Sequence, residues 1–394
     1  MITIAIFILI LGLLVFVHEI GHFWVSRRNK VEVEEFGFGF PPRIFGIYWN
    51  KKKERKIIWG SKEIKEVREA REIDGETTVY SVNWIPLGGF VKITGEDGDK
   101  KENPKSFAAK KPFTRIKILA AGVVMNFLLA VVLFSLGFWL GVPQADYEVK
   151  SGNIRGEKIQ IVDVRKGTPA EAMNLRVGDE ILGALKENNL IKFSSVEEVQ
   201  NFIKENKGNQ MILEIQRGKD KLEISGVPRT DFPDNEGPLG IGLTKIVVVK
   251  YSWYKAIILG FQYTFSLMIT FVSFLGLLIW RLIIGQPAGF DVSGPIGIAV
   301  LTGQVAQLGF DYLIRFTGML SINLAIINIL PIPALDGGRI LFILIEKFKG
   351  SPISQKFEQR AHSLGFALLI SLMVFVTVRD FAKFDLIKKV INLF

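Results

Sequence analysis

Five apolar segments stand out from the more polar remainder of the chain. They cover residues 2–22, 118–142, 256–280, 316–335 and 364–378. A helix needs about 20 apolar residues to cross a bilayer, and the first four segments have that length. The fifth is shorter, but it extends back through Ala361, His362 and Ser363. The pattern therefore predicts a multi-pass α-helical membrane protein.

The basic residues between these segments indicate the direction in which each segment crosses. Residues 27–56 carry nine basic side chains and follow directly on the first segment. Basic loops are retained on the cytoplasmic side, so we expect residues 1–26 to span inward and residues 116–142 to return outward. Residues 147–230 then lie on the exoplasmic side of the membrane.

The third apolar segment has two possible interpretations. If it crossed the membrane, residues 337–360 would lie outside, although they carry five basic side chains. The positive-inside rule favours the opposite arrangement, in which residues 251–311 are membrane-associated without crossing. Residues 314–338 and 361–379 are then the third and fourth spans. Three lysines in the C-terminal tail argue against this direction.

Composition narrows the class of protein further. Of the 394 residues, 49% are hydrophobic and 22% are charged. This is too apolar for an ordinary soluble protein and too charged for one that lies wholly in the bilayer, so we expect at least one aqueous domain. The basic excess lies mainly beside the first span and has no RNA-binding or phosphate-loop motif with it, which favours lipid and excludes nucleic acid as a partner. The absence of cysteine excludes disulfides and thiolate metal sites.

The most informative motif is His18-Glu19-Ile20-Gly21-His22, at the end of the first apolar segment. Ionisable side chains are costly in hydrocarbon, so a function is expected for them. Two histidines four residues apart lie on one face of a helix, and neutral imidazole is a good zinc ligand. Glu19, adjacent on the helix, can take a proton from metal-bound water. The alternative is a pair of interfacial histidines hydrogen-bonded to neighbouring helices.

Two histidines leave a catalytic zinc site one protein ligand short. The third histidine of the chain, His362, has no partner at helical spacing. Asp336 is a better candidate, because it follows an apolar segment and two helix-breaking prolines, Pro331 and Pro333. It could instead form only a turn with the glycines that follow. The topology favours the ligand: at about 1.5 Å per residue His18 approaches the cytoplasmic side, where an inward third span also places Asp336.

Two regions between the spans have the pattern of small β domains. Residues 31–105 alternate apolar and polar side chains in two stretches, and glycines in both let another backbone approach closely. Gly88 and Gly89 lie in the second stretch and are equally consistent with an ordinary turn. Residues 147–230 predict strands, a short helix, a capped helix and a hairpin, in an order that resembles a PDZ domain.

Over nearly its whole length the sequence resembles the site-2 protease family, in particular its bacterial RseP-like branch. The resemblance rests on HEIGHFWVSRR, IPLGGFVKITGE, SGPIGIA and INLAIINILPIPALDGGRILFILIEKFKG. Members of this family are zinc intramembrane proteases of the bacterial plasma (inner) membrane. The resemblance implies that His18, His22 and Asp336 bind Zn²⁺ and that Glu19 is the catalytic acid and base.

The resemblance also implies how substrate is held. Asn328 and Asn323 would keep the substrate extended, although both could be helix-packing asparagines. Gly88 and Gly89 would belong to a membrane-associated β-loop whose edge receives the unwound substrate. The expected substrates are single-span membrane proteins, such as anti-sigma factors after a first cut or signal-peptide remnants.

The resulting expectation is a protein of about four transmembrane helices and one membrane-associated helix, with a cytoplasmic-side β-loop and an exoplasmic (periplasmic) PDZ domain. The PDZ groove either binds peptides or gates access, and a single copy argues against size filtering by two. A second hypothesis is a non-proteolytic PDZ-bearing membrane scaffold or chaperone with a structural metal site. Glu19 argues against it, because a scaffold needs no general base. The sequence leaves the oligomeric state open.

Overall fold

The computed structural model describes residues 2–50, 52–60, 78–145, 153–186, 189–218, 220–233, 236–286 and 294–383. Residues 61–77, which belong to the predicted β-loop region, lie outside this set. The chain forms two compact units. The first is Met1–Leu133, Phe261–Gly303 and Phe316–Phe394, and the second is Phe134–Gly260 and Gln304–Arg315.

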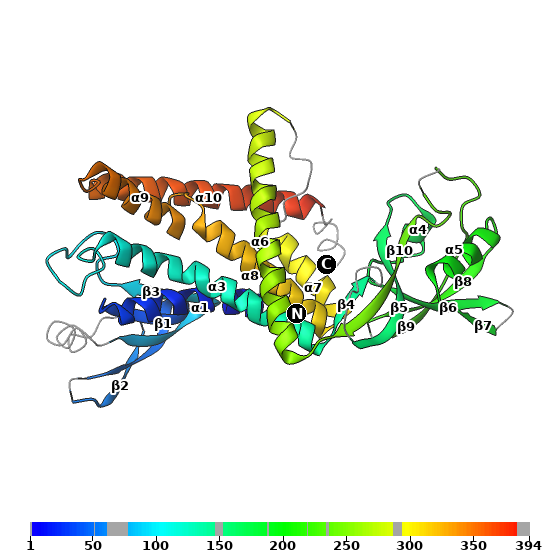
Figure 1. The fold of residues 1–394 in the computed structure, drawn as a ribbon, viewed down its shortest axis with the longest axis horizontal. Helices are drawn as coiled ribbons and strands as arrows, with labels where there is room; N and C mark the ends of the chain where they lie inside the picture. Colours follow the sequence, from blue (N-terminus) through cyan, green and yellow to red (C-terminus); the bar gives the residue numbers. More distant parts are fainter. Residues whose placement is uncertain are drawn as a thin grey trace. The chain divides into compact units, whose positions relative to one another are not determined.

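Among the described residues, five helices are long and apolar enough to cross a membrane, and they coincide with the five apolar segments of the sequence (Figure 1). They are α1 (Ile2–Arg28), α3 (Pro112–Leu140), α6 (Trp253–Ile283), α8 (Phe310–Ile329) and α10 (Gln355–Lys383). Two shorter helices are α7 (Pro295–Leu308) and α9 (Asp336–Lys349). Large apolar side chains stay exposed along these helices, including Phe265 at 47% and Leu364 at 71%. Such surfaces are stable in lipid, so the chain is a multi-pass helical membrane protein.

Contacts inside the first unit fix the relative directions of three helices. Ile118 of α3 contacts His22 and Asn126 contacts His18, so α3 runs antiparallel to α1. Helix α8 runs parallel to α1. Its Asn328 contacts His18, and its Ser321 hydroxyl donates to the Asn126 carbonyl oxygen of α3. Where both helices continue into the second unit, a Cβ on Gly137 of α3 would lie 3.7 Å from Arg315 Cγ, so α8 is antiparallel to α3.

The third predicted span, residues 314–338, is not one helix. Helix α8 ends at Ile329, and a separate helix, α9, begins at Asp336. Pro331 and Pro333 account for the break, because proline lacks the N–H that continues a helix and clashes with the preceding turn. The Asp336 loop, which we define as residues 330–336, carries its aspartate to the first position of α9.

A small sheet packs against α1, and its two long strands match the two predicted alternating stretches. Its strands are β1 (Val33–Trp49), β2 (Arg55–Trp59) and β3 (Val79–Ile93), in the order β2-β1-β3. Both long strands fold back on themselves, since Phe38 pairs with Gly89 on one side and with Val82 on the other. The outermost segment, residues 89–93, pairs only with β1 among the described residues. It therefore has a free edge.

The second unit is built on an antiparallel sheet with a conventional buried core. Its strands are β4 (Val142–Ala145), β5 (Asn153–Val164), β6 (Glu180–Lys186), β7 (Asn189–Lys192), β8 (Met211–Arg217), β9 (Asp220–Gly226) and β10 (Ile241–Lys250). Two helices accompany it, α4 (Pro169–Ala172) and α5 (Val196–Glu205), and the Ser195 hydroxyl caps α5 by accepting from the Glu198 N–H. The core consists of Ile159, Ile161, Ala170, Leu175, Ile181, Ala184, Val199, Ile203, Met211, Leu213, Ile215 and Leu239.

This domain extends beyond the predicted boundary at residue 230. Strand β10 pairs with β5 along almost its full length and with β4 at Ile246–Val249. It lies between these two strands, which begin about 90 to 100 residues earlier in the sequence. Because β10 adjoins an apolar helix and pairs with distant partners, local patterning could not assign it to the domain.

Candidate metal centre

His18 and His22 project from consecutive turns of α1 toward α3. Both side chains are buried, each residue being 6% exposed. Helix α3 can approach closely because its facing residue is Gly122, where a Cβ would lie 2.5 Å from both His18 Cε1 and His22 Nε2. Gly21 has the same role on α1, since a Cβ there would lie 2.4 Å from the Ala121 carbonyl oxygen. Close contact of the two backbones therefore presses both imidazole rings into a narrow space.

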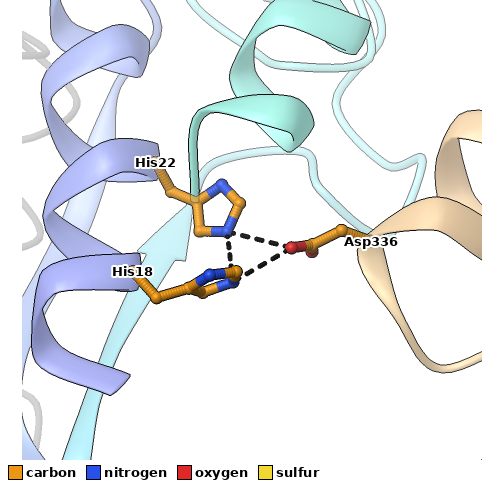
Figure 2. A group of neighbouring side chains, drawn as sticks. All are labelled: His18, His22 and Asp336. Atoms are coloured by element: carbon orange, nitrogen blue, oxygen red, sulfur yellow. Dashed lines mark hydrogen bonds and ion pairs between the residues drawn. The ribbon is translucent and has the colours of Figure 1, made fainter. Parts of the chain in front are cut away.

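Asp336 meets both histidines at one point (Figure 2). Its Oδ2 lies 3.0 Å from His18 Nε2 and 3.3 Å from His22 Nε2, and the two Nε2 atoms are 3.1 Å apart. All three predicted ligands thus come together, from α1 and from the start of α9. Two nitrogens and a carboxylate oxygen converge on a single position.

The geometry of this triangle fits a zinc ion. Zinc–nitrogen and zinc–oxygen bonds of about 2.0–2.1 Å in a tetrahedral site place neighbouring ligand atoms about 3.3 Å apart. The three observed separations, 3.0, 3.1 and 3.3 Å, are close to that edge length. Among the described residues, His18, His22 and Asp336 form a group that could hold a metal ion. The donor set of two imidazoles and one carboxylate is typical of catalytic zinc, with the fourth position left for water.

Helix α3 orients both rings through their second nitrogens. His22 Nδ1 donates to the Ile118 carbonyl oxygen at 2.8 Å, which leaves the lone pair of the neutral ring on Nε2. Asn126 Nδ2 lies 3.4 Å from His18 Nδ1, and the buried Oδ1 of the same amide has no hydrogen-bond partner in the described chain. Rotating the amide brings Oδ1 to His18 Nδ1–H and directs the His18 Nε2 lone pair toward the metal position.

Sequence reasoning did not identify Asn126, although a signal for it was present. It is a polar side chain in the middle of an apolar span and is fully buried. A polar residue inside a span is by default a candidate for function. The Ile118 carbonyl carries no such signal, because every residue offers one. Only the packing of α3 on α1 singles it out.

Glu19 lies on α1 between the two histidines, where the β-loop approaches the helix. The backbone N–H of Val91, in the free-edged part of β3, donates a hydrogen bond to its carboxylate. Nearby, Arg339 of α9 pairs with Glu96 at 2.7 Å. Burial raises the pKa of the Glu96 carboxyl, and the Arg339 guanidinium opposes that rise. The centre is therefore enclosed by α1, β3, the loop after β3 and α9.

The two predicted substrate asparagines differ in position. Asn328 Nδ2 lies 3.4 Å from His18 Nε2, so Asn328 is at the centre. Asn323, five residues earlier on α8, makes no hydrogen bond to a residue of the centre within the described ranges. Five residues correspond to about 500° of helical rotation, which places the two side chains on different faces. The structure brings only Asn328 to the metal centre.

Gly88 and Gly89 lie where β3 contacts α1 and β1. Gly88 has a positive φ of 96°, and a Cβ there would lie 2.5 Å from Val15 of α1. A Cβ on Gly89 would lie 2.8 Å from the Gly37 carbonyl oxygen of β1. The close backbone approach expected from the sequence is therefore present. It brings β3 against the helix that carries both histidines.

Comparison with known proteins agrees with this geometry. The model of peptidase family M50 matches residues 6–59 and 68–372. Zinc metalloprotease RasP of Oceanobacillus iheyensis is 31% identical over an alignment that covers 96% of this chain and 99% of RasP. The regulator of sigma-E protease RseP of Escherichia coli is 28% identical, with 96% and 98% covered. The chain therefore belongs to peptidase family M50 and is a site-2-type intramembrane zinc metalloprotease.

Proposed function

We propose that this protein cleaves transmembrane segments of single-span membrane proteins at a zinc ion held by His18, His22 and Asp336. The observation that carries the proposal is the convergence of two imidazole nitrogens and one carboxylate oxygen at the end of an apolar helix. An acidic side chain, Glu19, lies beside them on the same helix. This combination provides a metal site and a proton carrier in a position that a membrane-embedded peptide can reach.

The chemistry divides between the metal and the protein. When bound, zinc acts as a Lewis acid that polarises the scissile carbonyl and lowers the pKa of water. Glu19 accepts the proton of the attacking water and transfers it to the amine as the C–N bond breaks. Ile118 and Asn126 keep the histidine lone pairs directed at the metal. Asn328, whose amide can donate, would bind a substrate carbonyl.

A transmembrane helix must be unwound before it can be cut, because its carbonyls are engaged in hydrogen bonds. Unwound backbone survives in the membrane only where protein replaces those bonds. The outer edge of β3, residues 89–93, has no strand beyond it among the described residues and so offers a place for strand addition. Val91 in this edge contacts Glu19, so an added strand would run past the catalytic carboxylate. Gly88 and Gly89 contribute by allowing this edge to lie directly against α1.

The parallel course of α1 and α8 supports a topology in which α6 does not cross the membrane. Two helices that run in the same direction must be separated by an odd number of crossings. Helix α3 is one such crossing, and α7, with 14 residues, is shorter than the roughly 20 that a span requires. A crossing α6 would make the number even and turn α8 around. With α6 along the membrane, Arg27 and Arg339 both lie on the cytoplasmic side and the second unit is exoplasmic.

The domain of the second unit supports a PDZ assignment with a usable groove. A cavity of about 200 Å³ lies between α5 and the start of β10, lined by Ile203, Lys204 and residues 237–241. The first half of β10, Ile241–Lys245, pairs with β5 on one side and has no strand on the other within the described residues. A helix beside a free strand edge is the arrangement that binds an extended peptide by strand addition. The groove either recruits substrates or belongs to a domain that only limits access.

Cleavage by purified protein in detergent tests the proposed function. Wild-type protein should carry about one zinc per chain and cut a model single-span substrate within its apolar segment. Glu19→Gln keeps the size and hydrogen-bonding capacity of the side chain but removes the base. We expect it to retain zinc and bind uncut substrate, with turnover reduced about 10²–10⁴-fold. Cleavage by Glu19→Gln at the wild-type rate would contradict the mechanism.

The same assay separates the protease from the second hypothesis, a PDZ-bearing membrane scaffold or chaperone with a structural metal site. A scaffold would bind single-span proteins without cutting them, and Glu19→Gln would then behave like the wild type. Physiological substrates, such as anti-sigma factors or signal-peptide remnants, would be sought among proteins that accumulate uncut in cells that carry Glu19→Gln.

Side-specific thiol labelling tests the topology. A cysteine at Asn50 should react only from the cytoplasmic side, and cysteines at Lys221 and Gln286 only from outside. Labelling of position 286 from the cytoplasm would show that α6 crosses.

Gln200→Trp, on the exposed side of α5 at the groove, should lower cleavage of every substrate if the groove recruits them. Unchanged rates, with large exoplasmic domains still excluded, would favour gating.

A further inference from the structure

His362 has no place in the mechanism above, yet its environment is unusual. It lies near the start of α10, and its Nδ1 accepts a hydrogen bond of 2.8 Å from the backbone N–H of Ala334. The other ring nitrogen, Nε2, is buried without a hydrogen-bond partner in the described part of the chain, and Glu358 is 3.9 Å away. The bond to Ala334 therefore fixes the ring. Because Nδ1 accepts, the proton of the neutral imidazole is on Nε2.

Ala334 is in a conformation that its side chain disfavours. Its φ is +82°, in the left-handed region where a Cβ is crowded by its own backbone. It sits in the Asp336 loop, two residues before the third ligand. The left-handed turn sets the direction in which the chain enters α9, and thus the direction of Asp336. An alanine holds such a turn only where neighbouring contacts fix it.

Helix α10 supplies those contacts. One turn after His362, Gly365 meets the loop so closely that a Cβ would lie 2.3 Å from the Pro333 carbonyl oxygen. The same face of α10 thus packs against Pro333 and bonds to Ala334. On the far side of the turn, a Cβ on Gly338 would lie 2.2 Å from the Ile332 carbonyl oxygen. The loop is enclosed, and His362 provides its hydrogen bond from α10.

We propose that His362 is a positioning residue for the metal centre: by accepting from the Ala334 N–H, it holds the left-handed turn that presents Asp336 to His18 and His22. The inference rests on the proposed ligand role of Asp336. It explains why a partly buried histidine outside the group of His18, His22 and Asp336 lies against the loop that carries Asp336. It also assigns α10, which contributes no ligand, a part in assembling the site.

The geometry of the acceptor makes the proposal testable with near-isosteric variants. In asparagine Oδ1 is bonded to Cγ, as Nδ1 is in histidine, so His362→Asn retains an acceptor at the same place. His362→Gln moves the amide one bond farther out, and His362→Leu removes the acceptor. Ser363→Ala, at the next and exposed position of α10, is the matched control. Ala334→Gly removes the crowding that disfavours a positive φ.

Two measurements on the full-length protein in detergent are needed. The first is hydrogen exchange of the segment 330–338 in zinc-free protein, and the second is zinc affinity by competition with a chelator. His362→Leu and His362→Gln should exchange faster in this segment and bind zinc about 10–100-fold more weakly. His362→Asn and Ser363→Ala should stay close to the wild type. When Ala334→Gly is combined with His362→Leu, the double variant should bind zinc more tightly than His362→Leu alone.

Several outcomes would overturn the proposal. Wild-type exchange and zinc affinity in His362→Leu would do so, as would equal behaviour of folded His362→Asn and His362→Gln. If His362→Leu does not fold, the comparison of Asn with Gln decides alone. If instead Asp336 is not a ligand, Asp336→Ala will bind zinc with unchanged affinity. Hydrogen exchange of residues 330–338 would then still show whether His362 holds the loop.

Discussion

The two sides of the metal centre are held in place by different kinds of contact. On one side, α1 presents His18 and His22 from successive turns of an uninterrupted helix. On the other, Asp336 follows a loop with two prolines and a left-handed alanine, held by a side chain of α10. Local helical hydrogen bonds fix the spacing of the two histidines, whereas segments distant in sequence fix the position of Asp336. The α1 side is thus set by the helix, and the loop side by tertiary packing.

Helix α3 contacts both α1 and α8. It touches both histidine rings through Gly122, Ile118 and Asn126, and its Asn126 carbonyl accepts from the Ser321 hydroxyl of α8. His18 and His22 therefore need a second helix for their orientation even though their spacing is local. We therefore expect substitutions of the three predicted ligands, of the α3 contacts and of the loop contacts to weaken zinc binding to different extents.

Removal of a ligand from either side should have the largest effect. His22→Ala and Asp336→Ala should each lose bound zinc and cleavage together, because a catalytic site needs three protein ligands. Metal analysis after dialysis, with thermal unfolding as the check of folding, measures this. Full zinc affinity in Asp336→Ala would show that zinc binding does not depend on the Asp336 loop.

The second-largest effect is expected from a substitution that fills the space between α1 and α3. Gly122→Ala places a Cβ 2.5 Å from both rings, and overpacking of about 1–3 kcal/mol corresponds to about 5–150-fold weaker zinc binding. Gly137→Ala on the same helix is the control, since its Cβ would meet only Arg315 Cγ, at 3.7 Å. Chelator competition gives both affinities, and equal values would show that the rings do not depend on α3.

Loss of the Asn126 amide should weaken zinc binding about 10-fold, the lower end of the range for outer contacts to metal ligands, because its 3.4 Å contact is long. Asn126→Ala removes the group that sets the tautomer of His18 while leaving α3 able to form. The cobalt-substituted protein should show an altered absorption spectrum. A spectrum and an affinity identical to those of the wild type would mean that packing alone orients His18.

The ion pair on the loop side should matter least. Arg339 and Glu96 are 27% and 26% exposed, and such pairs contribute about 0.2–1 kcal/mol. Arg339→Ala should therefore weaken zinc binding by no more than about fivefold, with Arg339→Lys in between. A loss as large as that of His362→Leu would move the main support of Asp336 from α10 to the loop after β3.

The sequence by itself determined the elements whose signal is local. The apolar lengths predicted the long helices, the alternating stretches predicted β1 and β3, and the spacing of His18, Glu19 and His22 predicted a shared helix face. The prolines after α8 together with the LDGG motif directed attention to Asp336. Each of these signals comes from residues within one helix, one strand or one loop, where periodicity and propensity are sufficient.

Only the tertiary structure decided which distant groups meet. It joined β10 to a sheet begun about 100 residues earlier, and it placed Asn126 but not Asn323 beside the histidines. It also gave His362, which the sequence left without a partner, a contact 28 residues away. Such contacts depend on how helices pack, and packing depends on shape complementarity across the chain, which local pattern does not encode.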